Sequence, residues 1–419
     1  MVRQVVSLYK FRVHALSVFF VRILVVSLGV LLVPLESVMA EETHAADPPR
    51  PAPVQPLTRL ASIDQEVAKA IAAGKMPGCV VLVGRVGPER QDSDILWFKA
   101  YGEREDGVPM TTNTVFDLAS LTKPIATACS VMQLVERGKL QLDDPVARHL
   151  PAFAAKGKQD VTIRHLLTHT SGLAPANPLS DFADGPEAGF AAMYQDKLRY
   201  KTGTYRYSDV GFMMLGRIIE RASGQPLDRW FATELAAPLG IDMGFRPDAE
   251  RQARCAPTQR RGGSWMRGQV HDPRAWALDG VAGHAGLFGT AAELSVFAQM
   301  LLNHGAVLGG DKGRRVLKKE GVALMTRSLV VRAAAPRVAE RRRALGWDAG
   351  PGSSNRSDAY SDRAFGHGGF TGTGLWIDPV RNVYVIFLSN RVYPNGEGSV
   401  NPLIGQIGSI TVEAVDRED

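Results

Sequence analysis

The amino-acid sequence predicts a mixed α/β fold, in which strands from both ends of the chain form one layer and a large helical insertion separates them. Two observations support this prediction. Strand-like runs occur near residues 79–101 and again near 374–388, whereas the apolar residues between these regions recur mostly at helical spacing. Helical patterns also precede the first strands and follow the last ones. The element order is therefore helix, strands, helices, strands, helix.

The first predicted elements are one helix and two strands. The helix is indicated by apolar residues at every third or fourth position up to Gly74, where it is expected to end: Leu60, Ile63, Val67 and Ile71. The runs 79–83 and 95–101 are rich in apolar residues and are separated by a polar turn, which is typical of two neighbouring strands.

The middle of the chain is predicted to be helical, notably over 120–136, 211–221 and 291–302. Near the C-terminus, the runs 374–377 and 383–388 are expected to form strands around an Asp378-Pro379 turn, and 402–415 a last helix. We therefore assign one domain to residues 58–419. Its α/β part covers about 58–118 and 280–419, and its helical part covers about 119–279.

The first forty residues are typical of an export signal. Basic residues precede an apolar run of 13 residues, 23–35, and small residues follow up to Ala40, where cleavage is expected. A membrane span needs about 20 apolar residues, and Arg22 interrupts the longer stretch. We expect an exported protein, periplasmic or secreted. The alternative is an uncleaved N-terminal anchor, and the Pro-rich stretch 41–57 is then a tether.

Composition excludes two classes of protein. Hydrophobic residues make up 45% of the chain and charged residues 22%, so a disordered chain is excluded. The net charge is +6, and without the first forty residues 45 basic and 42 acidic residues remain, a surplus of +3. With so small a surplus and no basic stripe, nucleic acid is not an expected partner. Three cysteines cannot form a disulfide framework.

The first motif that carries chemistry is Ser120-Leu121-Thr122-Lys123, at the start of the predicted helix 120–136. Residues three positions apart share one face of a helix, so the serine hydroxyl and the lysine amine can meet. If burial lowers the pKa of Lys123, its amine can assist removal of the serine proton. The helix N-terminus also offers N–H groups to a developing negative charge.

Two later motifs give this first one its weight. Tyr207-Ser208-Asp209 stands just before an apolar helix, and His367-Gly368-Gly369 stands at the start of the C-terminal strands. Three motifs in this order resemble those of the penicillin-recognising serine hydrolases, which include class C β-lactamases, DD-carboxypeptidases and related esterases. The signatures of that superfamily are Ser-x-x-Lys, Tyr-x-Asn and Lys-Thr-Gly. The resemblance extends over about residues 60–415.

The resemblance implies a β-lactamase/transpeptidase-like fold, with an antiparallel sheet flanked by N- and C-terminal helices. It implies that Ser120 is the nucleophile, that Lys123 shuttles its proton and that Tyr207 is the general base. The backbone N–H groups of Ser120 and Phe370 would form the oxyanion hole. Four residues would contact the substrate: Asp209, His367, Gly368 and Gly369. No metal ion or organic cofactor is implied. Whether Tyr207 or Lys123 takes the first proton stays open.

Two departures from the signatures bear on the substrate. Asp209 replaces an asparagine, and an ionised carboxylate has no donor for a substrate carbonyl. His367 replaces a lysine and is mostly neutral at pH 7, while Gly368 lacks the threonine hydroxyl. Both changes weaken the grip on a substrate carboxylate and favour esters or less anionic amides, unless Arg391 or another cation compensates. Asp209 is interpreted as ordering its neighbours or capping the next helix.

Three other candidates were weighed from residue type and spacing. His165 and His169 are four residues apart, as zinc ligands can be, but Leu166 stands where a zinc-protease helix has its glutamate, so a structural loop is favoured. His284 either touches the cleft or fixes a turn. Residues 341–343, three consecutive arginines, are predicted to be a solvated surface segment.

The sequence therefore predicts an exported serine hydrolase that acts through an acyl-serine intermediate on an ester or D-amino-acid amide. Its substrate would be a small molecule or a peptidoglycan-like peptide, and a membrane contact is expected only through an uncleaved N-terminal segment. A class C-like β-lactamase is the enzymatic alternative. The alternative from another class is a non-catalytic cell-wall-binding homologue.

Overall fold

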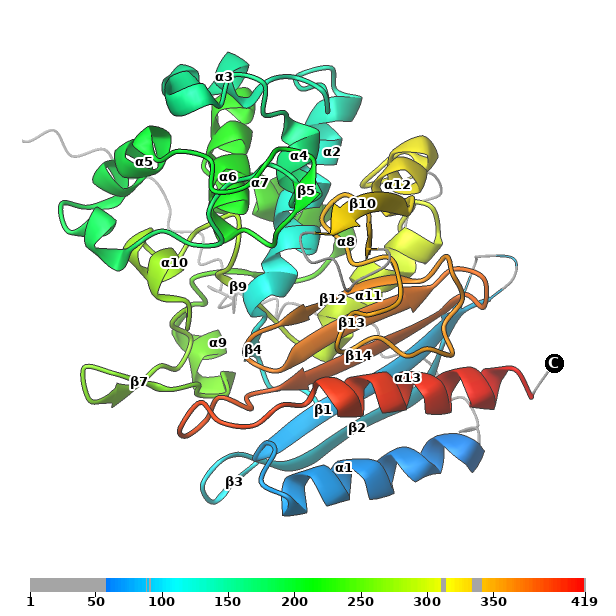
Figure 1. Ribbon diagram of the computed structural model, residues 1–419. Helices are drawn as coiled ribbons and strands as arrows, with labels where there is room; N and C mark the ends of the chain where they lie inside the picture. Colours follow the sequence, from blue (N-terminus) through cyan, green and yellow to red (C-terminus); the bar gives the residue numbers. More distant parts are fainter. Residues whose placement is uncertain (1–57, 88, 90–91, 310–313, 334–340, 418–419) are drawn as a thin grey trace, which may run out of the picture. The chain divides into compact units, whose positions relative to one another are not determined.

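The computed structural model describes residues 58–87, 89, 92–309, 314–333 and 341–417, and it confirms the predicted mixed α/β fold (Figure 1). The export signal predicted at 1–40 and the linker predicted at 41–57 lie outside the described residues. Within the described ranges, no helix is both long and apolar enough to cross a membrane.

The main sheet joins the two ends of the chain, as predicted. Its strands are antiparallel throughout, in the order β12-β13-β14-β1-β2-β3. Their bounds are β1 Gly78–Val86, β2 Ser93–Glu105, β3 Val108–Pro109, β12 Phe365–Gly369, β13 Thr373–Asp378 and β14 Val383–Ser389. In the central pairing Cys79 lies opposite Ser389, which brings together residues 310 positions apart. The expected strands 79–83, 95–101, 374–377 and 383–388 all lie within this sheet.

Helices cover both faces of the sheet because its strands are apolar on both sides. Along β1, Val81 and Val83 pack with the terminal helices α1 (Ser62–Ala72) and α13 (Asn401–Val415), which lie side by side on one face (Figure 1). The alternate residues Val80 and Leu82 join the larger core on the other face, where α11 (Ala291–Leu302) packs against β1 and β14. The predicted first and last helices are confirmed.

The segment between the two halves of the sheet is mainly helical. It begins with a 3₁₀ turn at Ala119–Leu121 and a π-helix at Lys123–Ala128, which continue into α2. The α-helices of this segment and of the following part are α2 Cys129–Glu136, α3 Val146–His149, α4 Ile163–Leu167, α5 Pro186–Gln195, α6 Asp209–Ser223, α7 Leu227–Phe231, α8 Ala237–Leu239, α9 Ala249–Arg254, α10 Pro273–Ala277 and α12 Lys319–Thr326.

Short strands outside the main sheet connect segments that are distant in sequence. One set has the order β11-β10-β5, with β5 Thr204–Tyr205, β10 Leu329–Ala333 and β11 Arg341–Arg343. Another has the order β4-β9-β6, with β4 Phe116–Asp117, β6 Gly244–Phe245 and β9 Leu287–Gly289; a further pair is β7 Arg260–Arg261 and β8 Ser264–Trp265. Strand β4 leads directly into Ser120, and β5 leads into Tyr207. All three cysteines are buried and unpaired.

Candidate active site

The first motif lies at the start of a helical stretch, where its spacing brings the two side chains together. The predicted helix 120–136 is present, but its first turns are a 3₁₀ turn and a π-helix rather than regular α-helix. Lys123 Nζ lies 2.9 Å from Ser120 Oγ and donates a hydrogen bond to it. Lys123 is fully buried, whereas Ser120 is partly exposed and therefore accessible to a substrate.

The backbone just before Ser120 is held in an unusual conformation. Ala119 has a φ of 46°, in the left-handed region that residues other than glycine seldom adopt. The buried carboxylate of Asp117 accepts the Ala119 N–H at 2.8 Å and the His271 N–H at 2.6 Å. Burial raises the pKa of Asp117 to about 6, although these two N–H donors lower it. Asp117 thus fixes the turn that presents Ser120.

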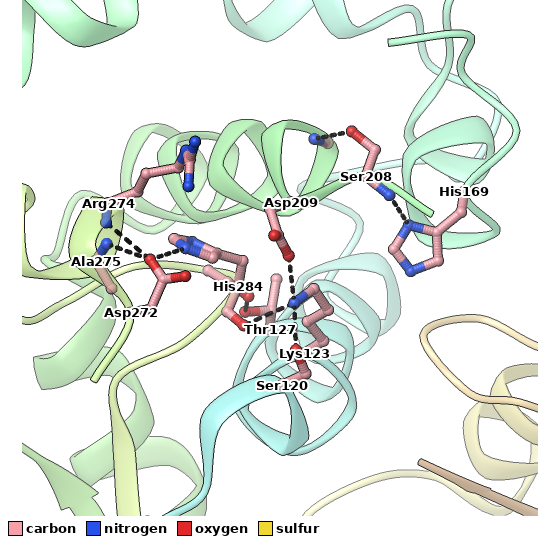
Figure 2. Close-up of polar contacts among 12 residues, drawn as sticks. Ser120, Lys123, Thr127, His169, Ser208, Asp209, Asp272, Arg274, Ala275 and His284 are labelled. Carbon is pink, nitrogen blue, oxygen red and sulfur yellow. Dashed lines mark hydrogen bonds and ion pairs between the residues drawn. The ribbon is translucent and has the colours of Figure 1, made fainter. Parts of the chain in front are cut away.

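Lys123 is held by three oxygen atoms. Its Nζ lies 2.9 Å from Ser120 Oγ, 2.9 Å from the His284 backbone oxygen and 2.7 Å from Asp209 Oδ1 (Figure 2). Burial lowers the pKa of Lys123, but the charges of Asp209 and Tyr207 outweigh it, so that the pKa lies above its ordinary value. The condition considered for Lys123 as a base, a lowered pKa, is therefore not met. Lys123 is a cation at neutral pH.

Tyr207 completes a group of three with Ser120 and Lys123. Its ring lies 5.0 Å from Lys123 Nζ and stacks on the ring of His169, with 4.3 Å between the ring centres. Burial raises the pKa of Tyr207 above its ordinary value, while the Lys123 charge and hydrogen bonds to Lys123 and Ser120 lower it. The neighbouring Ser208 is the N-cap of α6 and accepts the Gly211 N–H at 3.1 Å.

Asp209 orders its neighbour, which is one of the two roles predicted for it. It is the first residue of α6, but the cap is Ser208, and its carboxylate forms an ion pair with Lys123. Burial raises the pKa of Asp209, but Lys123 and His284 lower it further, so that it stays below its ordinary value. A direct contact between Asp209 and a substrate stays a prediction, since one of its oxygens is occupied by Lys123.

The histidines weighed as zinc ligands have separate structural roles. His165 accepts the Thr162 N–H at 3.2 Å in the capping box of α4, whereas His169 accepts the Ser208 N–H at 3.1 Å and supports Tyr207. Throughout the part of the chain that the structure describes, no group of three or more His, Cys, Asp or Glu side chains could hold a metal ion. His284 has both roles considered for it. Its carbonyl contacts Lys123, and its ring pairs with Asp272, the N-cap of α10.

The third motif lies on β12, as expected. His367 is buried, and its Nδ1 hydrogen points to the Gly368 carbonyl at 2.7 Å. Burial lowers the pKa of His367 to about 4, even though the nearby Asp348 raises it. His367 is therefore neutral at pH 7, which agrees with the expectation from its residue type. It does not supply the positive charge of the lysine found in the family signature.

The glycines of this motif are required by close neighbours. A Cβ on Gly368 would lie 2.3 Å from Asn355 Nδ2, so the Asn355 amide occupies the space that a threonine side chain would need. A Cβ on Gly369 would lie 2.6 Å from the Leu118 backbone oxygen. The amide of Asn355 therefore lies beside Gly368, where the family signature has a threonine.

The turn that carries Phe370 is fastened to the segment before Ser120. Thr371 Oγ1 donates to the Asp117 backbone oxygen at 2.7 Å, and Thr373 Oγ1 donates to the Leu118 backbone oxygen at 3.1 Å. These two hydrogen bonds connect β12 and β13 to the start of the nucleophile helix. They bring the backbones of Phe370 and Ser120 together, while the Phe370 side chain stays 60% exposed.

A cavity of about 350 Å³ opens beside these residues. Two cations line it, Arg341 and Arg391, together with Asp348 and Tyr207. The remaining lining residues are mostly polar or glycine: Ser353, Ser354, Asn355, His367, Gly368, Gly369, Phe370, Gly398, Ser399 and Asn401. Arg391 Nη2 also donates to the Phe370 carbonyl at 2.6 Å. The cavity can therefore receive a polar or anionic group.

The prediction that residues 341–343 form a solvated segment is wrong. They form β11, in which Arg343 is fully buried and Arg341 lines the cavity, and both guanidinium groups bind Asp348. The period of two in a strand places the first and third arginine on one face. That alternation was the available signal, and sequence reasoning missed it. No local pattern pointed to Asn355.

Comparisons with known proteins agree with this geometry. The family described as Beta-lactamase matches residues 63–407. The chain is 32% identical to an “N-acetylmuramyl-L-alanine amidase” of Bacillus subtilis (strain 168), over 80% of this chain and 81% of that protein. It is also 32% identical to a “Putative D-alanyl-D-alanine carboxypeptidase” of Escherichia coli (strain K12), over 84% of this chain and 87% of that protein. A penicillin-binding protein homologue from Caulobacter crescentus shares the fold, with a TM-score of 0.66 at 22% identity over 88% and 99% of the two chains.

Proposed function

Because the chain belongs to the beta-lactamase family of serine hydrolases, we propose that it is an exported enzyme that cleaves an ester or D-amino-acid amide through an acyl-Ser120 intermediate. The observation that carries this proposal is the 2.9 Å hydrogen bond between Lys123 Nζ and Ser120 Oγ, beside the ring of Tyr207. Export rests on the signal predicted at 1–40. It is tested by locating the protein in cell fractions and by determining its mature N-terminus.

The proposed reaction has two halves. Because Lys123 is already protonated, we assign the first proton transfer to Tyr207. Burial raises the pKa of Tyr207, so its phenolate is the minor form at neutral pH; this form takes the Ser120 proton, and Oγ attacks the carbonyl carbon. The N–H groups of Ser120 and Phe370 receive the negative oxygen. The carbon–leaving group bond then breaks as Tyr207 returns its proton to the departing amine or alcohol. In the second half, Tyr207 takes a proton from water, which attacks the acyl-Ser120 ester. Tyr207 returns this proton to Ser120 Oγ as the ester bond breaks, and the acid is released.

Of the two substrate types, the cavity favours an amide whose leaving group carries a carboxylate, as in a D-alanyl-D-alanine peptide. Arg341 and Arg391 line the same cavity as Phe370, and they are our candidates for the compensating cation that the sequence left open. The names of the Escherichia coli and Bacillus subtilis relatives are consistent with an amide substrate. A neutral His367 favours the second candidate, an esterase for uncharged substrates.

A matched pair of peptides tests the proposal. We expect release of D-alanine from an acyl-D-alanyl-D-alanine peptide, and a value of kcat/KM at least about tenfold lower for the C-terminal amide of the same peptide. Arg341→Met should weaken turnover of the acid alone. Arg332→Met, which removes an exposed cation on the neighbouring strand β10, is the control. Equal turnover of the acid and the amide would support the esterase instead.

Mass spectrometry separates the remaining alternatives. After incubation with a penicillin, we expect a stable adduct on Ser120 that is lost in Ser120→Ala. Rapid hydrolysis of nitrocefin without a lasting adduct would favour a β-lactamase. No adduct with a penicillin, an acyl ester or a fluorophosphonate would contradict catalysis and favour the non-catalytic cell-wall-binding homologue.

A further inference from the structure

Two buried or half-buried arginines share one carboxylate beside the proposed active site. Arg343 Nη1 and Arg341 Nη2 both donate to Asp348 Oδ1, the second at 3.3 Å. Arg343 is fully buried, and its Nε and Nη2 have no hydrogen-bond partner among the described residues. Two guanidinium groups carry two positive charges and one carboxylate carries one negative charge, so this arginine cluster has a net charge of +1. A buried cation without full pairing is costly, so its retention here calls for a role.

The fold places this charge beside the segment that carries Tyr207. In the set β11-β10-β5, Val331 on β10 lies opposite Arg341, and Ala333 lies opposite Tyr205. The guanidinium carbons of Arg341 and Arg343 lie 5.1 and 5.6 Å from the centre of the Tyr205 ring, two residues before Tyr207.

Asp348 is held against β12 by a pair of backbone hydrogen bonds. The Asp348 N–H donates to the Gly366 oxygen at 2.8 Å, and the Gly366 N–H donates to the Asp348 oxygen at 3.0 Å. This places the arginine cluster beside His367, whose ring centre lies 6.1 Å from that of Tyr207. Tyr207, Asp348 and His367 line the same cavity. The cluster therefore reaches this cavity through Arg341 and Asp348, whereas Arg343 is fully buried.

The other charged groups around Tyr207 cancel one another. From the nucleophile helix Lys123 contributes a positive charge, and from α6 Asp209 neutralises it at 2.7 Å. His169, after α4, is neutral because burial lowers its pKa well below the ordinary value. His367, on β12, is neutral with a pKa of about 4. Arg391 is a second cation in the lining of the cavity, where its guanidinium donates to the backbone oxygens of Phe370, Gly396 and Gly398. On the side of β11, the surplus charge is that of the arginine cluster.

We propose that Arg343 is a positioning residue that supplies, from β11, the fixed positive charge which favours the phenolate of Tyr207. This inference rests on the proposed function, in which Tyr207 takes the Ser120 proton. The family signature has a lysine at the start of the third motif, and here His367 is neutral in its place. Arg343 supplies the positive charge from a different strand, and Asp348 sets how much of it remains.

The electrostatics of Arg343 agree with this role. Burial lowers the pKa of Arg343, but Asp348, Tyr205 and Tyr207 raise it more, so that the guanidinium stays charged. Coupling is reciprocal, because a charge that is stabilised by the Tyr207 phenolate also stabilises that phenolate. One unit charge several ångströms away in a partly buried site shifts a pKa by about one unit.

The test compares pH–rate profiles of two opposite changes. The measured quantity is kcat/KM for p-nitrophenyl acetate, an uncharged ester whose binding needs no cation, between about pH 7 and 11.5, because the pKa of Tyr207 lies above its ordinary value. The spontaneous hydrolysis of the ester is subtracted at each pH. Arg343→Met removes the surplus charge and should move the acid limb of the profile about one unit higher. The rate below the limb then falls about tenfold and recovers at high pH. Asp348→Asn increases the surplus and should move the limb lower.

Two controls and the contrary results complete the design. Arg343→Lys keeps the charge and should keep the limb near its wild-type position, and Arg332→Met should leave the whole profile unchanged. A uniform loss of rate in Arg343→Met, or a shift of both variants in the same direction, would show a structural role and overturn the proposal. Absence of any turnover in the wild-type enzyme would instead overturn the proposed function, and this inference with it.

Discussion

The first and third motifs of this chain build their parts of the site in opposite ways. Ser120 and Lys123 meet within one helical turn, and their geometry depends on residues next to them in sequence, such as Asp117. The third motif, by contrast, has a neutral histidine and a glycine where the family signature has a lysine and a threonine. Polar groups of residues 341–355 lie beside it: Arg341 lines the same cavity, and the Asn355 amide lies next to Gly368.

This difference indicates which functional groups of a site must stay on one structural element and which can be supplied by another element in a divergent family member. A nucleophile and its partner need fixed bonding distances, so they stay on one rigid element. A positive charge acts over several ångströms and can be supplied from another strand. The space beside β12 can likewise be filled in two ways, either by a side chain at position 368 on the strand or by the side chain of Asn355 from a neighbouring segment. The four predictions below test this comparison.

The largest effect is expected from the local pair. Lys123→Ala should lower kcat/KM for a short-chain ester by about 10³- to 10⁴-fold, because Ser120 loses its hydrogen-bond donor and Asp209 is left without its cation. Circular dichroism would confirm folding, and Lys139→Ala on an exposed loop is the control. A loss below tenfold would contradict the view that Ser120 needs Lys123 for its reactivity.

A second prediction tests whether the Asn355 side chain takes the place of the threonine that the family signature has at position 368. Gly368→Thr should lower kcat/KM by about 10- to 100-fold, because the new Cβ would lie 2.3 Å from Asn355 Nδ2. The double variant Gly368→Thr/Asn355→Ala frees this space and should recover much of the loss. Additive losses in a double-mutant cycle would show that the two positions do not exchange roles.

A third prediction concerns the carboxylate that neutralises Lys123. In Asp209→Asn the pKa of Lys123 should fall, because Asp209 raises it in the wild-type enzyme. The alkaline limb of the pH–rate profile should therefore move to lower pH, with about a tenfold loss above it. Asp181→Asn, away from the site, should leave the limb in place. An unmoved limb in Asp209→Asn would mean that Lys123 need not stay protonated.

The smallest effect is expected in the stability of the fold. His367 has a pKa of about 4 when folded, whereas an unfolded histidine titrates near 6.5. The unfolded chain therefore binds a proton that the folded one does not, and stability falls as pH decreases from about 6.5 toward 4. By pH 5.5 the loss should be about 1 kcal/mol. The free energy of unfolding is measured with urea between pH 5.5 and 8. In His367→Asn its decrease toward low pH should be smaller than in the wild-type protein by this amount.

Sequence reasoning succeeded where contacts are local or periodic. The predicted helices, four strands of the main sheet and the meeting of Ser120 with Lys123 follow from spacings of two, three or four residues. The order of the three motifs was enough to expect Tyr207 near that pair. The antiparallel sheet came from the family resemblance rather than from any spacing.

Other features depended on tertiary contacts that no local pattern encodes. The pKa of Lys123 is set by Asp209 on another helix, and the burial of Arg343 is set by the pairing of β10 and β11. A run of three arginines favours solvent on composition alone. Only a carboxylate such as Asp348, placed by the fold, makes it possible to bury one of them.

The pairing of β1 with β14 has a consequence for the moment at which activity first arises. Ser120 leaves the ribosome 250 residues before Phe370, and the sheet that holds Phe370 in place is completed only by residues 383–389. A nascent or truncated chain would thus carry its nucleophile without a complete oxyanion hole. Translation must therefore pass the last strand of the sheet before Ser120 and Phe370 can be held in one cleft.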